Sequence, residues 1–199
     1  MTLIDEIRAL QRQRNAVILA HNYQPDDVQD LADFTGDSLE LARKAADVQA
    51  DVIVFCGVHF MAETAAILNP GKTVLIPAAD AGCPMADMIT GDQLRDLKAR
   101  HPGAKVLCYV NSTAEIKAES DCCVTSANAL AVARTFPPEQ EIIFVPDRHL
   151  GSYTAEKLGR SFILWPGFCP THARMNERQI AAARAAHPGA PVLVHPECP

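Results

Sequence analysis

Short apolar runs alternate with helical patterns along the whole chain. The strands that these runs predict are Ala16–Ala20, Val52–Phe55, Thr73–Ile76, Lys105–Val110, Cys122–Thr125, Glu141–Val145, Phe162–Leu164 and Val192–Val194. Helical spacing predicts an N-terminal helix and others from Ser38, from Phe60, near Thr90–Arg100, near Thr113–Glu119, from Asn128 and near Asn176–His187. Apolar runs this short are typical of parallel strands that are covered on both faces. We therefore expect an α/β fold with short parallel sheets between layers of helices.

A sequence repeat links two loops that each contain a Cys-Pro pair. Cys83-Pro84 and Cys169-Pro170 stand 86 residues apart (169 − 83), and the segment His101–Leu107 returns at His187–Leu193 with the same spacing. A repeat at a fixed period indicates symmetric or stacked copies of one supersecondary unit. Because each copy delivers a cysteine in a loop, the repeat favours a shared centre lined by cysteines.

The repeat also extends towards the N-terminus in a weaker form. Ala16–His21 aligns with Ala104–Tyr109 at an offset of 88 (109 − 21), and Ser38 and Ser126 keep that offset (126 − 38). Three copies are thus expected to begin near residues 16, 104 and 190. The predicted domains are 1–82, 83–168 and 169–199, the last being the start of an incomplete third unit. The chain is expected to represent about two-thirds of a threefold-repeated protein.

The charge of the chain narrows the classes of partner. The formal net charge is −6, the isoelectric point is about 5.6, and there is no basic run. These values argue against nucleic acid as a partner. The N-terminus lacks the apolar core of a signal peptide, and no stretch approaches the roughly 20 apolar residues of a membrane helix. We expect a cytoplasmic protein.

Polar residues follow three predicted strands at the same position of the repeat. They are His21-Asn22-Tyr23, Tyr109-Val110-Asn111 and His195-Pro196-Glu197. Ligands of open α/β sheets bind outside the carboxyl ends of the strands, so we interpret these side chains as functional. Ser38 and Ser126 precede the next helical patterns, where a serine can cap the helix and also help to bind an anion.

The seven cysteines fall into two groups. Disulfides are not expected in a cytosolic chain, so a special cysteine would be a ligand or a nucleophile. Cys56, Cys108, Cys122 and Cys123 lie in apolar runs and are predicted to be small structural residues, like most cysteines in such runs. The two Cys-Pro loops offer no packing reason for a cysteine. With a third copy near residue 255 (169 + 86), three thiolates would leave one iron of a 4Fe–4S cluster open.

The motifs of the chain, taken together, resemble those of the quinolinate synthase family over essentially its whole length. They are AHNYQ (20–24), GDSLELAR (36–43), FCGVHFMAETA (55–65), AGCPMADM (81–88), YVNS (109–112), TSANA (125–129), PDRHLG (146–151), GFCPTH (167–172) and HPE (195–197). The resemblance implies three pseudo-threefold αβα domains around a central site, with one cysteine from each holding an oxygen-sensitive 4Fe–4S cluster. It also implies condensation of iminoaspartate with dihydroxyacetone phosphate to quinolinate, with loss of phosphate and water, in de novo NAD biosynthesis. L-aspartate oxidase would be a functional partner.

The resemblance implies roles for individual residues. Cys83 and Cys169 match cluster ligands, and Tyr23 matches a residue of proton transfer. Glu197 would be the general base, with His195 beside it as a further catalytic residue. The positions that match substrate-binding residues are His21, Ser38, Tyr109, Val110, Asn111, Ser126, His195, Pro196 and Glu197.

Three other residues are expected to stay outside the ligand set. The third cluster cysteine should lie beyond Pro199, and Cys198 breaks the register of the repeat, so we do not expect it to replace that ligand. His59 and His172 lie outside the cysteine register. They are expected to be structural, or to contact the ligand residues without binding the metal themselves. Two alternatives stay open: a non-catalytic fragment that binds a metal or a cluster, and a metal-free α/β enzyme that acts on a carboxylate substrate.

Overall fold

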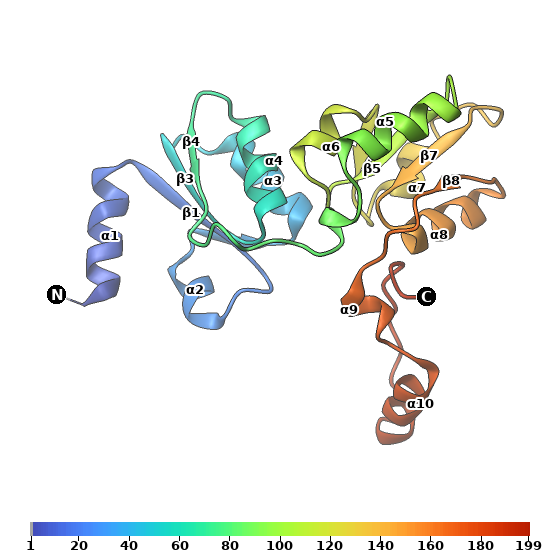
Figure 1. Cartoon of the computed structure of the whole chain (residues 1–199). Helices are drawn as coiled ribbons and strands as arrows, with labels where there is room; N and C mark the ends of the chain where they lie inside the picture. Colours follow the sequence, from blue (N-terminus) through green and yellow to red (C-terminus); the bar gives the residue numbers. More distant parts are fainter. Residues whose placement is uncertain (1) are drawn as a thin grey trace. The chain divides into compact units, whose positions relative to one another are not determined.

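The computed structural model describes residues 2–199, so Met1, the first residue of the predicted first domain, lies outside the described residues. The chain forms two compact units, one up to Cys83 and one from Pro84 to Pro199. Each unit holds a four-stranded parallel sheet, with strand order β2-β1-β3-β4 in the first and β6-β5-β7-β8 in the second (Figure 1). The predicted α/β fold with short parallel sheets is confirmed. The division at residue 169 stays a prediction.

The first unit alternates strands and helices from its N-terminus. Its strands are β1 (Ala16–His21), β2 (Phe34–Gly36), β3 (Val52–Cys56) and β4 (Thr73–Leu75). Its helices are α1 (Leu3–Gln13), α2 (Asp26–Leu31), α3 (Ser38–Asp47) and α4 (His59–Leu68). Helices α3 and α4 pack against each other, and Leu19, Leu41 and Phe55 are buried between these layers.

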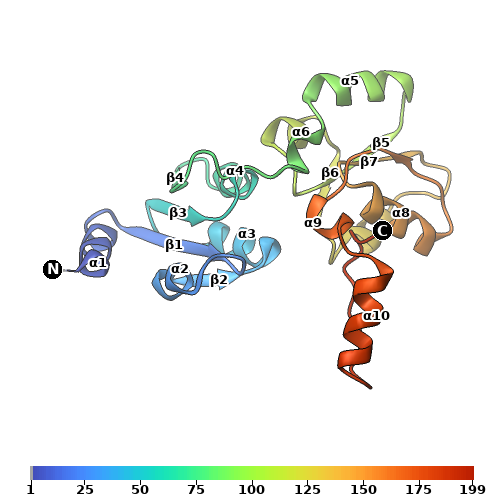
Figure 2. The same cartoon turned by 60° about the horizontal axis from the view of Figure 1, so that its bottom comes forward.

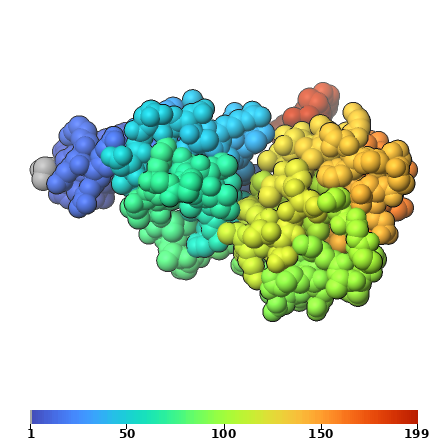
Figure 3. All heavy atoms as spheres, turned by 90° about the horizontal axis from the view of Figure 1, so that it is seen from above, coloured from blue at the N-terminus to red at the C-terminus, as the bar shows by residue number. Residues whose placement is uncertain are grey.

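The second unit has the same sheet plan with more helices. Its strands are β5 (Lys105–Tyr109), β6 (Cys122–Val124), β7 (Ile142–Val145) and β8 (Ile163–Leu164). Its helices are α5 (Gly91–Arg100), α6 (Ala114–Ala118), α7 (Ala129–Ala133), α8 (Arg148–Leu158), α9 (Pro170–Ala173) and α10 (Glu177–Ala186), with a 3-10 turn η1 (Ala86–Met88). Apolar residues of η1, α5, α6 and the sheet share one buried cluster. The green to orange part of the unit is closely packed in the space-filling view (Figure 3).

The same aspartate contact ties two strands together in both units. In the first, Asp33 accepts a bond from the Ile18 amide at 2.8 Å and donates its own amide to the Ile18 carbonyl at 2.8 Å. In the second, Asp121 and Val106 make the same pair of bonds at 2.8 and 3.1 Å. The residue numbers of both members of the pair differ by 88 between the two units (121 − 33 and 106 − 18). The structure thus confirms the offset that the sequence repeat predicts.

Three helices share one set of end signals. Helices α1, α5 and α10 each begin with a capping box, made by Thr2 with Asp5, Thr90 with Gln93, and Asn176 with Gln179. After each helix a residue with positive φ turns the chain: Asn15 (46°), Gly103 (90°) and Gly189 (81°). Glycine and asparagine adopt this conformation at little steric cost. The local signals of the repeat therefore occur three times in the chain.

The strand predicted at Val192–Val194 is not formed. Strands β1 and β5, at the corresponding places of the repeat, are each hydrogen-bonded to neighbours on both sides. Residues 192–194 have no strand partner among the described residues, and Leu193 is 93% exposed. An apolar run without a neighbouring strand leaves its backbone groups to water, so periodicity alone did not produce a strand. Helix α10 likewise buries no residue and extends away from the sheet of its unit (Figures 1 and 2).

Replacing Asp121 with asparagine should make the stability of the second unit less dependent on pH in acid. Partial burial by itself raises the pKa of Asp121. Hydrogen bonds from Lys105 Nζ (2.7 Å) and the Val106 amide lower this pKa by more, so the net result is a pKa below the ordinary value of 3.8. The carboxylate therefore stabilises the fold above about pH 4, and this contribution is lost as the pH falls through the folded-state pKa. We expect a loss of about 1 kcal/mol at pH 7. Urea unfolding at pH 7 and pH 3 measures it, and an equal loss at both pH values would contradict the assignment.

Candidate functional site

Four predicted site residues meet at the C-terminal turn of the second unit. His195 Nε2 lies 3.1 Å from Ser126 Oγ, and the Glu197 amide donates to His195 Nδ1 at 3.3 Å. Since Nδ1 accepts that bond, the neutral imidazole carries its proton on Nε2 and donates it to Ser126. Tyr109, at the carboxyl end of β5, interacts with both Ser126 and Glu197. The structure thus brings residues of three separate motifs together.

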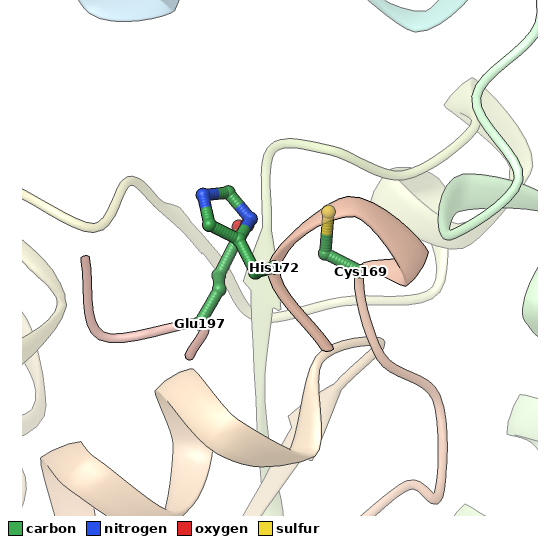
Figure 4. A group of neighbouring side chains, drawn as sticks. All are labelled: Cys169, His172 and Glu197. Atoms are coloured by element: carbon green, nitrogen blue, oxygen red, sulfur yellow. The ribbon is translucent and has the colours of Figure 1, made fainter. Parts of the chain in front are cut away.

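Cys169 and His172 lie next to Glu197 in this group. Cys169 is the N-cap residue directly before α9, and His172 lies three residues later, on this helix. Their donor atoms and a carboxylate oxygen of Glu197 all lie within 4.8 Å of one another. Figure 4 shows the His172 ring over the carboxyl end of Glu197, with the Cys169 side chain rising from the start of α9. Thiol, imidazole and carboxylate are the side-chain groups that bind transition metals, so this part of the second unit is a candidate metal site.

The contact between His172 and Glu197 is close but poorly aligned. His172 Nδ1 lies 2.6 Å from Glu197 Oε2, and the His172 ring stacks on His195 with centroids 4.8 Å apart. Even so, His172 Nδ1 and Glu197 Oε1 are buried without a hydrogen-bond partner among the described residues. Glu197 is only 2% exposed. A buried carboxylate with an unused oxygen is costly, so the group suits a bound cation or substrate.

The Asp147 carboxylate accepts a hydrogen bond from the Cys169 backbone and so fixes its position. Its Oδ1 accepts from the Leu150 amide at 2.7 Å and caps α8, while Oδ2 accepts from the Cys169 amide at 3.1 Å. The side chain is fully buried. One carboxylate therefore fixes both the start of α8 and the loop that carries the thiol.

The electrostatics of this group favour a positive charge. Burial raises the pKa of Tyr109 well above its ordinary value, and the Glu197 carboxylate adds to this. Burial also raises the pKa of Asp147 and of the Cys169 thiol, again with a contribution from Glu197. Among residues 2–199, the basic side chains within 4.0 Å of the Glu197 carboxylate are two histidines, His172 and His195, which carry a positive charge only when protonated. Acidic groups therefore outnumber fixed cations here, which fits a site that binds a metal.

Asp147→Ala should destabilise the second unit by about 1–3 kcal/mol, because it removes a helix cap and leaves the partly buried Cys169 amide without its acceptor. Asn176→Ala, which removes the exposed cap of α10, is the matched control and should cost about 1 kcal/mol or less. Thermal unfolding monitored by circular dichroism compares the two variants. Equal losses would show that the bond to Cys169 contributes nothing to stability.

The predicted residues of the first unit form a second group. The rings of His21 and Tyr23 lie 4.5 Å apart, and the Tyr23 amide donates to His21 Nδ1 at 3.2 Å. Partial burial lowers the pKa of His21, and the nearby Asp37 opposes this. Tyr23 itself is 86% exposed. Cys83 is partly exposed at the end of this unit.

The serines do not cap helices in the manner predicted. Asp37 caps α3, with Oδ1 accepting from the amides of Leu39 and Glu40, and Ser38 is the first residue of the helix. Helix α7 begins at Ala129 after Asn128, so Ser126 lies in the turn before the helix and does not occupy its cap position. Aspartate is as good an N-cap residue as serine, and Asp37, which precedes Ser38, occupies the N-cap position of α3. The Ser126 hydroxyl is instead available to His195.

The remaining predicted positions lie in the turns that follow the strands. Val110 continues the edge of β5, its amide donating to the Val124 carbonyl at 2.9 Å. Asn111 Oδ1 is buried without a hydrogen-bond partner among the described residues. Pro196 lies inside a turn closed by a bond from the Cys198 amide to the His195 carbonyl at 3.0 Å. An unused buried amide oxygen in such a turn is suited to a ligand.

Two residues of this group, His172 and Asp147, are not among the predicted site residues. His172 is predicted to be structural or to support the ligands, and the structure places it beside Cys169 and Glu197 in the candidate metal group. The Cys-Pro-Thr-His spacing at a helix start could have indicated it, since residues three apart share one helix face. Asp147 lies within the PDRHLG motif (146–151), yet nothing local shows that its partner is Cys169, 22 residues away.

The other cysteines follow the prediction only in part. Cys108 is buried, as expected for a small apolar residue, whereas Cys56 and Cys122 are half-buried and Cys123 is exposed. Cys123 lies on β6, an edge strand, which explains its exposure. Cys198 lies outside the candidate metal group, with its Sγ 3.8 Å from Met175 Sδ. Within residues 2–199, no helix is both long and apolar enough to span a membrane.

Comparison with known proteins places the chain in a family. A family model described as "Quinolinate synthetase A protein" matches residues 5–199. Curated relatives named quinolinate synthase include those of Methanoregula boonei (60% identity over 196 residues), Dehalococcoides mccartyi strain CBDB1 (59% over 192) and Geobacter metallireducens (57% over 197). These matches cover 96–99% of the chain but only 63–65% of each relative. On the extent of the family match and on these identities, the chain belongs to the quinolinate synthetase A protein family.

Proposed function

We propose that this chain supplies the first part of a quinolinate synthase, which condenses iminoaspartate with dihydroxyacetone phosphate to quinolinate in de novo NAD biosynthesis. Phosphate and water are lost in this reaction. One observation carries the proposal: Tyr109, Ser126, Cys169, His195 and Glu197, which match functional positions of the family, converge in the second unit. Convergence of residues from distant motifs is expected of an active site and not of structural positions.

The cofactor of the proposed enzyme is a 4Fe–4S cluster. Cys83 and Cys169 would be two of its ligands, and a third cysteine would come from the part of the relatives that this chain does not cover. When bound, the cluster supplies an open iron that acts as a Lewis acid. The partly buried Cys169 thiol and the excess of acidic groups around it fit such a centre.

Substrate binding would depend on groups that still have hydrogen-bonding capacity. Ser38 is the first residue of α3, but the amides of Leu39 and Glu40 at this helix end already donate hydrogen bonds to Asp37 Oδ1. The hydroxyl, more than the helix end, is therefore proposed to bind a carboxylate or phosphate. In the second unit, Asn111 Oδ1 is free to accept a bond from the substrate. His195 Nε2 and Ser126 Oγ lie 3.1 Å apart, and both are proposed to bind a substrate oxygen.

The residues available for proton transfer differ in their surroundings. Glu197 can accept a proton from the forming ring, since its Oε1 has no partner among the described residues. Tyr109 stays protonated near neutral pH, because burial and Glu197 raise its pKa, so it would donate a hydrogen bond and not act as a base. Tyr23 is exposed beside His21 and could carry a proton between substrate and solvent. Iminoaspartate itself would come from an oxidation of aspartate, for which L-aspartate oxidase is the proposed partner.

A chimera tests this function. Residues 1–199 are joined to the remaining third of the Methanoregula boonei relative and purified without oxygen. We expect about four iron and four acid-labile sulfide per chain, together with quinolinate formation. Cys83→Ser and Cys169→Ser should abolish both, while Cys198→Ser should abolish neither. An iron-loaded chimera that makes no quinolinate would favour a cluster-binding module, and turnover in the two cysteine variants would favour a metal-free enzyme.

A further inference from the structure

We propose that Cys169, His172 and Glu197 bind one divalent metal ion of the zinc type when the chain holds no iron–sulfur cluster. Their donor atoms lie within 4.8 Å of one another, and all three residues belong to the second unit. Cys83, the other cysteine of the repeat, ends the first unit and is not part of this group. The proposed site therefore needs donors from the second unit alone.

The donor set matches the chemistry of zinc. Zinc sites combine cysteine sulfur, histidine nitrogen and carboxylate oxygen, and a three-residue site leaves a fourth position for water. Bonds of about 2.3 Å to sulfur and 2.0–2.1 Å to nitrogen or oxygen hold tetrahedral donors about 3.3–3.6 Å apart. The observed separations, from 2.6 Å between His172 and Glu197 to 4.8 Å at most, bracket that range. Small side-chain rotations are enough to form the site.

The unused atoms of the site give an independent reason for a ligand. Glu197 is 2% exposed, and its Oε1 and the Nδ1 of His172 lack hydrogen-bond partners among the described residues. A divalent ion would use such atoms directly. A thiolate and a carboxylate together neutralise its two positive charges, and the imidazole adds a neutral donor, so the buried site would carry no net charge.

Neighbouring residues already orient the three donors. Asp147 accepts from the Cys169 amide, and His195 stacks on His172 while its own Nε2 bonds to Ser126. Because Ser126 occupies His195, the fourth position is expected to hold water and not a second histidine. Such surrounding contacts typically strengthen metal binding by about 10–100-fold. The ion would also compete with a cluster for Cys169, so the proposal applies to the iron-free chain.

Zinc binding to the iron-free 199-residue chain tests the site. Zn²⁺ alone is added in equilibrium dialysis, and bound metal is measured per chain. We expect one zinc, with one sulfur and otherwise nitrogen or oxygen neighbours in X-ray absorption at the zinc edge. No bound zinc, or zinc without a sulfur neighbour, would overturn the proposal. This spectrum needs no substitution and so does not depend on a variant that folds.

Substitutions separate this site from the proposed cluster. Cys169→Ser, His172→Gln and Glu197→Gln should each weaken zinc binding at least about tenfold, the lower limit seen for outer-shell partners. Cys83→Ser, which should abolish the cluster, should leave zinc binding unchanged, as should Cys198→Ser and His149→Gln. Loss of zinc in Cys83→Ser would overturn the three-residue site. Co²⁺ gives a second readout, because its thiolate absorption should vanish in Cys169→Ser and persist in Cys83→Ser. Circular dichroism confirms that each variant is folded.

Discussion

Glu197→Gln should lower quinolinate formation in the chimera by about 10²–10⁴-fold, the usual contribution of a general acid or base. Glutamine has nearly the same shape and can still accept a hydrogen bond, but it cannot take a proton at neutral pH. The side chain is buried beside His172, so bulk water cannot replace it at this place. Steady-state rates with both substrates saturating measure the effect.

Two controls make this result specific. Iron and sulfide content should not change, because the proposed cluster ligands are cysteines. Glu177→Gln, on the exposed surface of α10, should leave the rate at the level of the unsubstituted chimera. Turnover of Glu197→Gln within about threefold of that level, with iron intact, would remove Glu197 from the proposed mechanism, since base removal costs far more.

Leu107→Ala should lower the free energy of unfolding of the second unit by about 2–5 kcal/mol. Leu107 lies in the middle of β5, between β6 and β7, and is fully buried. Its truncation removes apolar contacts on both sides and leaves a cavity that the sheet can fill only in part. Urea denaturation of the 199-residue chain, followed by circular dichroism, measures the loss.

The sequence repeat itself supplies the control. Leu193 is the counterpart of Leu107 in the next copy (193 − 107 = 86), and it is 93% exposed. Leu193→Ala should therefore change stability by no more than about 0.5 kcal/mol in this chain. Similar losses in the two variants would mean that Leu193 is buried in solution, in contrast to the structure.

Much of the fold could be predicted because its signals are local. Apolar runs and helix spacing located nearly all strands and most helices, and the repeat offset of 88 reappears in the bonds of Asp33 and Asp121. The prediction missed β2 and the helices α2, α8 and α9. Strand β2 has only three residues, and α8 begins with polar residues whose cap, Asp147, lies in a Pro-flanked segment. Neither shows a clear periodicity.

The sequence singled out most members of the candidate site but not the contacts between them. The repeat and the family motifs singled out Tyr109, Ser126, Cys169, His195 and Glu197. They could not show that His172 would meet Glu197 at 2.6 Å, or that Asp147 would hold the Cys169 amide. Contacts between residues far apart in sequence depend on how loops pack, and no local preference encodes that.

The sequence by itself determined the α/β class, the repeated unit, the family and the two cysteines that mark it, because periodicity, spacing and motifs are properties of the chain. Only the tertiary structure decided which apolar runs form strands and which buried carboxylates lack a hydrogen-bond partner. Leu107 and Leu193 carry the same local pattern, yet one is buried in a sheet and the other is exposed. The physical reason is that a strand and a buried carboxylate are defined by their neighbours: hydrogen bonds for the one, a counter-charge for the other.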